Sequence, residues 1–197
     1  MIRRLAERVA AEPLLFHFLR KVPEANYRAT KQRIARVRDA IGRPTVLDLG
    51  CGTGELATLF ASDGYVGVDV DANRVRFARR RLPLYRFQCA DARTWRNDGA
   101  PFDLVLVCGV LHHLGDDGAR TLLETARANV APQGVVLLVE DIHGASLGAR
   151  IVQSIEMGAH VRGPDEWTAL VSSVVRIDRT ETYESGVCPY VLLECRA

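Results

Sequence analysis

Glycines at alternate positions follow a short apolar run near residue 50 of this 197-residue chain. Residues 46–49 predict a buried parallel strand, and Gly50, Gly52 and Gly54 predict a tight turn that enters a helix. Glycine lets the backbone approach a ligand that a Cβ atom would hold away. The spacing differs from the Gly-x-Gly-x-x-Gly of dinucleotide sites, and no Lys-Ser or Lys-Thr pair follows, as it would in a phosphate-binding loop. The run therefore predicts a ligand-binding turn of another class.

Two carboxylates stand where the next two predicted strands end. Residues 65–69 predict a second strand that ends in Asp69, 19 residues after Gly50. An acid at about 20 residues from a glycine turn contacts a ribose in doubly wound folds. A carboxylate can accept two hydroxyl hydrogen bonds, which suits a vicinal diol. Residues 85–92 predict a third strand with Asp91 near its end.

Strand and helix patterns alternate along the chain. Further strands are expected at residues 102–110 and 134–140, with helical stretches in the gaps. This alternation favours a parallel sheet covered on both faces. Beyond residue 140, we expect a helix over residues 145–158 and another that begins near Pro164. Two strands are then expected at residues 174–183 and 187–196, joined around Ser185 and Gly186.

These segments, in this order, resemble the class I S-adenosylmethionine-dependent methyltransferases. The glycine run is similar to motif I of that family, and the resemblance covers roughly residues 44–140. It implies an α/β, doubly wound, Rossmann-like fold with a seven-stranded, mostly parallel sheet and one antiparallel strand in the final hairpin. It also implies a methyltransferase domain over residues 44–197, preceded by an N-terminal helical lid segment over residues 1–43.

The resemblance assigns roles to individual residues. Asp69 matches the acid that holds the adenosine ribose, and Asp91 and Ala92 match the pair that meets the adenine. Residues 111–114 match a run found after the fourth strand, and residues 130–134 match the turn before the fifth. We expect Tyr27 to cover the methionine end of the cofactor, with simple helix packing as the alternative. The other implied cofactor contacts are Asp48, Gly50, Cys51, Gly52, Gly54, Val70, Cys108 and Gly109.

A methyltransferase of this kind does not require a catalytic side chain. The methyl group of S-adenosylmethionine is already activated, and positioning alone can be worth ~7–11 kcal/mol. A general base is needed only where the acceptor retains a proton, so the catalytic residue is left unknown. The candidates are Asp141 and His143, at the end of the fifth strand, and His112 and His113, after the fourth, which otherwise shape that turn.

Composition limits the class of protein. The hydrophobic fraction of 48% is ordinary, and no apolar run approaches the ~18 residues of a membrane span. Acidic residues interrupt the N-terminal apolar pattern, so no secretory signal is expected and the predicted location is cytoplasmic. The five cysteines have no paired spacing, which favours free thiols and no metal. A net charge of +2 and the absence of a recognisable module argue against nucleic-acid binding.

Basic residues concentrate at the N-terminus. Eleven of the 26 Lys and Arg residues lie in residues 1–43, against four acidic ones. The segment has helical periodicity, with Ile34, Val37 and Ile41 on one stripe of the stretch over residues 26–41. The simplest explanation of this charge is a solvent-exposed outer helix face. The alternatives are a lid whose basic residues attract an anionic substrate and a helix that binds a membrane surface.

The predicted function is methyl transfer from S-adenosylmethionine to a small molecule, with an anionic acceptor as one possibility. Sequences such as Asn-Pro-Pro-Tyr, found in methyltransferases of base amines, are missing. Two alternatives stay open: aminopropyl transfer on the same scaffold, for which Glu140 and Asp141 are the candidate acids, and a non-catalytic cofactor-binding subunit.

Overall fold

A seven-stranded sheet organises the part of the chain that the computed structural model describes, residues 27–143 and 159–197. The strands lie in the order β3-β2-β1-β4-β5-β7-β6. Only β7 is antiparallel, to β5 on one side and β6 on the other, which confirms the predicted sheet. The strands are β1 (Val46–Leu49), β2 (Tyr65–Asp69), β3 (Arg86–Cys89), β4 (Phe102–Cys108), β5 (Val130–Asp141), β6 (Arg176–Ser185) and β7 (Cys188–Arg196).

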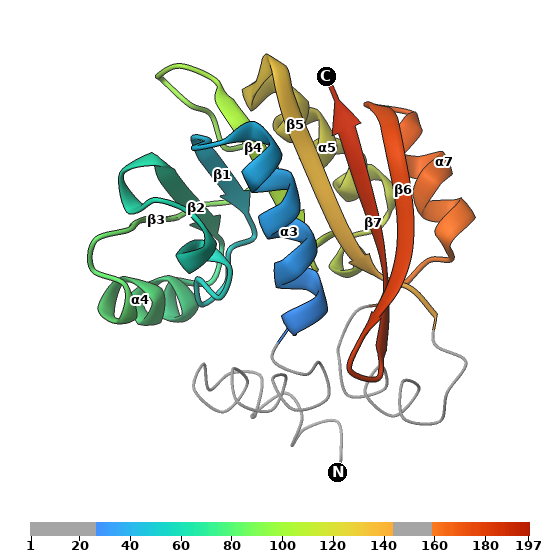
Figure 1. Cartoon of the computed structure of the whole chain (residues 1–197), viewed down its shortest axis with the longest axis horizontal. Helices are drawn as coiled ribbons and strands as arrows, with labels where there is room; N and C mark the ends of the chain where they lie inside the picture. The colour runs from blue at the N-terminus through green and yellow to red at the C-terminus, as the bar shows by residue number, and fades with distance from the viewer. Residues whose placement is uncertain (1–26, 144–158) are drawn as a thin grey trace.

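Helices cover both faces of this sheet (Figure 1). α3 (Arg28–Ile41) and α4 (Ala72–Arg81) pack on one face, and α5 (Asp116–Asn129) and α7 (Pro164–Ser172) on the other. Local signals fix their starts. The Asp71 side chain caps α4 by accepting from two backbone N–H groups, and Pro164 occupies the first turn of α7. The short 3-10 helices are η2 (Ala57–Leu59), η3 (Ser62–Gly64) and η4 (Leu111–His113).

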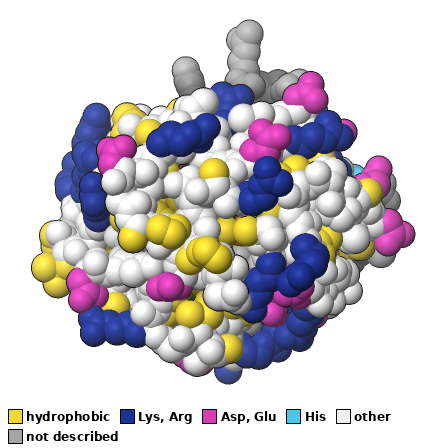
Figure 2. Space-filling model, turned by 90° about the horizontal axis from the view of Figure 1, so that it is seen from above, with side chains coloured by type: hydrophobic (Ala, Val, Ile, Leu, Met, Phe, Trp, Pro, Cys, Tyr) yellow, Lys and Arg dark blue, Asp and Glu magenta, His cyan; other side chains and the backbone are white. Residues whose placement is uncertain are grey.

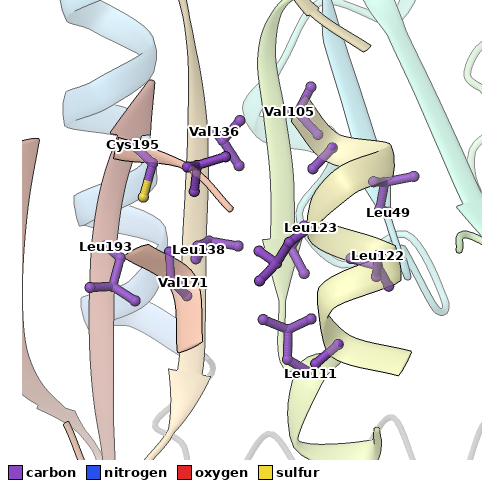
Figure 3. Close-up of a cluster of buried hydrophobic side chains, with 14 of the residues drawn as sticks. Leu49, Val105, Leu111, Leu122, Leu123, Val136, Leu138, Val171, Leu193 and Cys195 are labelled. Carbon is purple, nitrogen blue, oxygen red and sulfur yellow. The ribbon is translucent and has the colours of Figure 1, made fainter. Parts of the chain in front are cut away.

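The central strands are buried on both sides because their apolar residues alternate between two cores. In β4, Leu104 and Leu106 face the core beneath α3, whereas Val105 and Val107 face the core beneath α5 and α7. Figure 3 shows the second core, where Leu122 and Leu123 of α5 and Val171 of α7 approach the sheet. Burial of such a side chain stabilises the fold by about 1.5–3 kcal/mol, so these layers hold the strand ends in place.

Several boundaries differ from the sequence-based expectations. The glycine turn leads into η2 and not into an α-helix. Its three glycines have positive φ, which is not helical geometry, and few residues are left between them and β2. Residues 130–134 belong to β5, with a register shift against β4, and do not form a separate turn. A Cβ atom at Gly134 would lie 2.9 Å from the Asp103 carbonyl oxygen, so only glycine fits this close approach.

The remaining predicted elements can be placed as follows. The helix expected over residues 26–41 is α3, although Ile41 at its end is 37% exposed. The final hairpin forms around Gly186, at positive φ, with β6 shifted by two residues from its expected range. The helices expected within residues 1–25 and over residues 145–158 lie outside the described residues. No helix in the described ranges is both long and apolar enough to cross a bilayer.

Much of the basic charge near the N-terminus is paired. Arg33 and Arg36 of α3 both bind Glu181 of β6, with N···O distances of 2.7 and 2.9 Å, and Arg43 pairs with Asp63. On the face that Figure 2 shows, acidic side chains likewise lie among the basic ones. Such exposed pairs add little stability individually, but they reduce the charge excess of α3.

Candidate functional site

A cavity of about 580 Å³ opens at the carboxyl ends of β1, β2 and β4. This is the edge where ligands bind in open α/β sheets. Most of the sequence-predicted residues line it: Tyr27, Asp48, Gly50, Cys51, Gly52, Asp69, Val70, Asp91, Ala92, Cys108, Gly109, His112 and His113. Gly54, Asp141 and His143 do not. The fold therefore brings together residues that are far apart in the sequence.

The three glycines of the turn serve different purposes. All have positive φ, between 53° and 85°. A Cβ atom at Gly50 would lie 2.2 Å from a Val110 methyl carbon, and one at Gly54 would lie 2.8 Å from the Phe87 ring. A Cβ atom at Gly52 would meet nothing within 4 Å. Gly50 and Gly54 are thus required by packing, whereas the space beside Gly52 belongs to the cavity.

Asp69 is fixed at the wall of the cavity by backbone hydrogen bonds. Its Oδ2 accepts from the Gly52 N–H and its Oδ1 from the Asp71 N–H, both at 2.8 Å. The side chain is buried, yet each carboxylate oxygen has capacity for a further hydrogen bond. Beside it, Val70 is 72% exposed, an unusual degree for an apolar residue at a cavity. A carboxylate and an apolar surface therefore stand next to each other.

Asp91 faces the same cavity from the end of β3, and Arg93 holds it. The guanidinium donates to both carboxylate oxygens, with Nε 3.0 Å from Oδ1 and an Nη 2.6 Å from Oδ2. These hydrogen bonds keep the pKa of Asp91 below its usual range. Ala92, with 8% exposure, completes the local wall. The bidentate pair fixes the plane of the carboxylate.

Asp48 lies beneath the glycine turn and, unlike Asp91, is almost completely shielded from solvent. It is 2% exposed, and the Tyr65 hydroxyl donates to its Oδ2 at 2.5 Å. Burial raises the pKa of Asp48 to about 7, and the nearby Asp69 charge adds to this effect. Burial, with the same two acids, also raises the pKa of the Cys51 thiol well above its usual range. The thiol is therefore neutral at physiological pH and is not an activated nucleophile.

The loop after β4 is held by a buried acid. Glu140 accepts the backbone N–H groups of Val110 and Leu111, at 3.0 and 2.8 Å, and its Oε2 lies 2.8 Å from Nδ1 of His112. This arrangement fixes the orientation of the His112 ring, which is almost fully buried. The neighbouring His113 is exposed, with the two ring centroids 4.1 Å apart.

Asp141 and His143 do not reach the cavity although they end β5. Asp141 is 2% exposed and lies behind His112, with 3.4 Å between its Oδ2 and Nδ1 of that ring. The Trp167 indole donates to the Asp141 carbonyl oxygen at 2.9 Å, so α7 covers this strand end. His143 is exposed but does not line the cavity. Their expected contact with substrate lacks geometric support.

The cavity is also lined by residues that were not anticipated, among them Thr30, Glu55, Arg74 and Tyr190. Thr30 stands one helical turn after Tyr27 and accepts the Tyr183 hydroxyl hydrogen bond at 2.9 Å. Glu55 directly follows the glycine turn, so its position in the sequence was an available signal. Tyr190 comes from β7 and stacks on Tyr183, with ring centroids 5.6 Å apart. No local pattern indicates a contribution from so distant a strand.

No group of three or more His, Cys, Asp or Glu side chains in the described ranges has the geometry to hold a metal ion. The five cysteines, all within the described part, are free thiols.

The known proteins that this chain resembles are methyltransferases. Residues 46–134 match the family model described as "Methyltransferase domain". The chain is 36% identical over 124 residues to trans-aconitate 2-methyltransferase of Azoarcus sp. (strain BH72), across 60% of this chain and 47% of that protein. It is 38% identical over 104 residues to an uncharacterized methyltransferase of Mycobacterium tuberculosis (strain ATCC 25618 / H37Rv), across 50% and 51%. The chain spans about half the length of the curated relatives it matches.

Solved structures share the fold over nearly the whole chain. Mitomycin 7-O-methyltransferase superposes with a TM-score of 0.73 and 20% identity, covering 99% of this chain and 60% of that one. Magnesium protoporphyrin IX methyltransferase from Synechocystis PCC 6803, solved with bound SAH, gives 0.70 and 19%, covering 91% and 88%. Human N-acetylserotonin methyltransferase, solved with SAM, gives 0.68 and 21%, covering 96% and 56%.

Proposed function

We propose that this chain is a member of the class I S-adenosylmethionine-dependent methyltransferase family and that it transfers a methyl group from S-adenosylmethionine to a small-molecule acceptor. The observation that carries the proposal is the cavity at the carboxyl ends of β1, β2 and β4, where the open glycine Gly52 and the carboxylates Asp69 and Asp91 face the same space. The match of residues 46–134 to the methyltransferase family supports it.

The residues of the cavity fit the cofactor. Asp69, oriented by two backbone N–H groups, is placed to accept both ribose hydroxyls. Val70 and Ala92 offer apolar surface for the two faces of an adenine ring, and Asp91 offers an acceptor for its amino group. When bound, S-adenosylmethionine supplies a methyl group on a sulfonium, ready for transfer. The space beside Gly52 leaves room for backbone contact with the ligand.

The chain contributes position and shielding more than acid–base chemistry. Glu140 fixes His112 and the loop after β4, so this wall of the cavity is preorganised. On the acceptor side, Thr30 and Tyr190 provide buried hydroxyl groups that can orient a polar molecule. His113 is exposed and lines the cavity, and we propose it as the base for acceptors that retain a proton.

The acceptor is proposed to be a small organic molecule, with carboxylic acids as the first class to test. The support comes from the relatives named as methyltransferases of trans-aconitate, a carboxylic acid. Residues 1–43 are proposed to form a lid, supported by the lining positions of Tyr27 and Thr30. We propose a cytoplasmic location, where thiols such as those of Cys51 and Cys108 stay reduced.

Aminopropyl transfer receives no support from the geometry. The candidate acids for that reaction, Glu140 and Asp141, are 1% and 2% exposed and do not line the cavity. A non-catalytic subunit would bind the cofactor equally well, so only a measurement of methyl transfer distinguishes it from the proposed enzyme.

Calorimetry and a transfer assay test the proposal together. S-Adenosylmethionine and its demethylated product, S-adenosylhomocysteine, should bind, whereas NAD should not. Labelled methyl groups should then pass to at least one member of a panel of small carboxylic acids, phenols and amines. Binding of NAD without either methionine nucleoside would overturn the cofactor assignment. Tight cofactor binding with no transfer to fractionated metabolites would favour a non-catalytic subunit.

A further inference from the structure

Two cations from different helices meet one carboxylate at the wall of the cavity. Glu55 directly follows the glycine turn and lines the cavity, with its side chain 18% exposed. Its Oε1 lies 2.5 Å from Nζ of Lys31 in α3, and its Oε2 lies 3.5 Å from an Nη of Arg81 in α4. Glu55 therefore joins α3, the glycine turn and α4.

Both cationic side chains make further contacts that hold them beside the glycine turn and the cavity. Arg81 also donates to the carbonyl oxygens of Thr53 and Gly54, at 3.2 and 2.8 Å, so its charge is held against the turn. Nζ of Lys31 lies 5.9 Å from the centroid of the Tyr27 ring, which also lines the cavity. The side chains are only 22% and 29% exposed, so solvent screens them less than it screens surface ions.

Without Glu55, two positive charges would remain beside a cavity that receives a sulfonium. The two cofactor forms differ here, because S-adenosylmethionine has a positive sulfur and S-adenosylhomocysteine a neutral one. We propose that Glu55 sets the preference between these ligands by offsetting one of the two positive charges that Lys31 and Arg81 bring to this wall of the cavity. It thereby protects binding of the cationic substrate and limits inhibition by the neutral product. This inference rests on the proposed function.

A purely structural role for Glu55 predicts a different outcome. If its ion pairs only hold α3 against the glycine turn, their loss weakens both ligands by the same factor, since the two share the adenosine and the amino-acid groups. An electrostatic role changes the ratio of the two dissociation constants. The ratio therefore separates the two explanations even in a variant of lower stability.

The experiment measures both dissociation constants by calorimetry in Glu55→Gln, which keeps the size of the side chain and removes its charge. We expect the affinity for S-adenosylmethionine to fall about fivefold more than that for S-adenosylhomocysteine, because the variant leaves one more uncompensated positive charge in a partly screened site. High salt should reduce the difference. Lys31→Gln alone should shift the ratio in the opposite direction, and the double variant should return it toward the wild-type value.

Asp63→Asn is the matched control, because it breaks the exposed Arg43–Asp63 pair away from the cavity. It should leave the ratio unchanged. An equal loss for both ligands in Glu55→Gln, or a ratio insensitive to Lys31→Gln, would overturn the inference while leaving the proposed function intact. A wild-type protein that binds neither ligand would overturn the proposed function itself.

Discussion

The buried carboxyl of Asp48 should make the stability of the fold depend on pH in a way that one substitution removes. Burial raises the pKa of Asp48 from 3.8 to about 7. The native state therefore binds this proton more tightly than the unfolded chain does. Stabilisation from the protonated carboxyl is fully present below about pH 4, and it is lost as the pH rises toward the folded pKa near 7.

The size of the effect follows from the shift. Each pKa unit corresponds to 1.36 kcal/mol, so a shift of about three units makes the ionised form about 4 kcal/mol less favourable in the folded protein. In Asp48→Asn the side chain cannot ionise, while its amide oxygen can still accept the Tyr65 hydroxyl hydrogen bond. The free energy of unfolding of the variant, minus that of the wild type, should therefore rise by about 4 kcal/mol between pH 4 and pH 8.

Urea denaturation of both proteins at intervals between pH 4 and pH 8.5 measures this difference. Subtracting the two curves cancels the titration of the groups that do not interact with Asp48. Asn73→Ser serves as the control, because Asn73 is exposed and its side chain does not ionise, so its difference curve should be flat. A flat curve for Asp48→Asn would refute the reasoning, since it would mean that Asp48 ionises in the folded protein as readily as in the unfolded one.

The remaining predictions concern the ligand, the core and the lid. Asp69→Ala should lower the affinity for S-adenosylhomocysteine at least tenfold by calorimetry, since hydrogen bonds to a charged group contribute about 1.5–3 kcal/mol each. An unchanged affinity in a folded variant would show that Asp69 does not bind the ribose. Gly52→Val should abolish binding, because its side chain would fill the open cavity, and should also lower the stability of the fold, because Gly52 has a φ of 53°. Normal binding by the folded variant would show that the turn has no ligand role. Leu138→Ala should cost about 2–5 kcal/mol of unfolding free energy, as Leu138 is fully buried, and a loss below 1 kcal/mol on denaturation would contradict the core assignment. Deletion of residues 1–25 should leave a folded protein with weaker cofactor binding, and S-adenosylhomocysteine should slow proteolysis near Lys21 in the full chain. If cleavage does not depend on the ligand and the protein sediments with anionic vesicles in a salt-sensitive way, the segment binds a membrane surface instead.

Local chemistry explains why part of the site could be deduced from the sequence. The turn from Gly50 to Gly54 and the acid Asp69 are set by strand ends and spacing, and all but Gly54 reach the cavity. Gly54 is the exception because its conformational freedom serves packing against Phe87. A glycine required by a neighbouring ring has the same sequence signature as one required by a ligand.

Long-range packing explains what the sequence did not reveal. Asp141 ends a strand on the ligand side, yet α7 and His112 cover it, and no pattern near residue 141 foretells Trp167. Tyr190 enters the wall only because β7 returns antiparallel beside β5. Arg93 binds Asp91 only two residues away in the sequence. The spacing alone, however, does not show whether the arginine forms a bidentate pair or remains in solvent.

The hydrogen bond between Thr30 and Tyr183 joins residues 153 positions apart. Such a contact is slow to form, because a long loop must close before any contact stabilises it. During synthesis, α3 and the strands up to β5 emerge from the ribosome well before the hairpin of β6 and β7 that completes the wall with Tyr190. The lining residues from Tyr27 to Leu122 are therefore synthesised well before Tyr190, and the wall of the cavity is complete only after the last hairpin has folded onto β5.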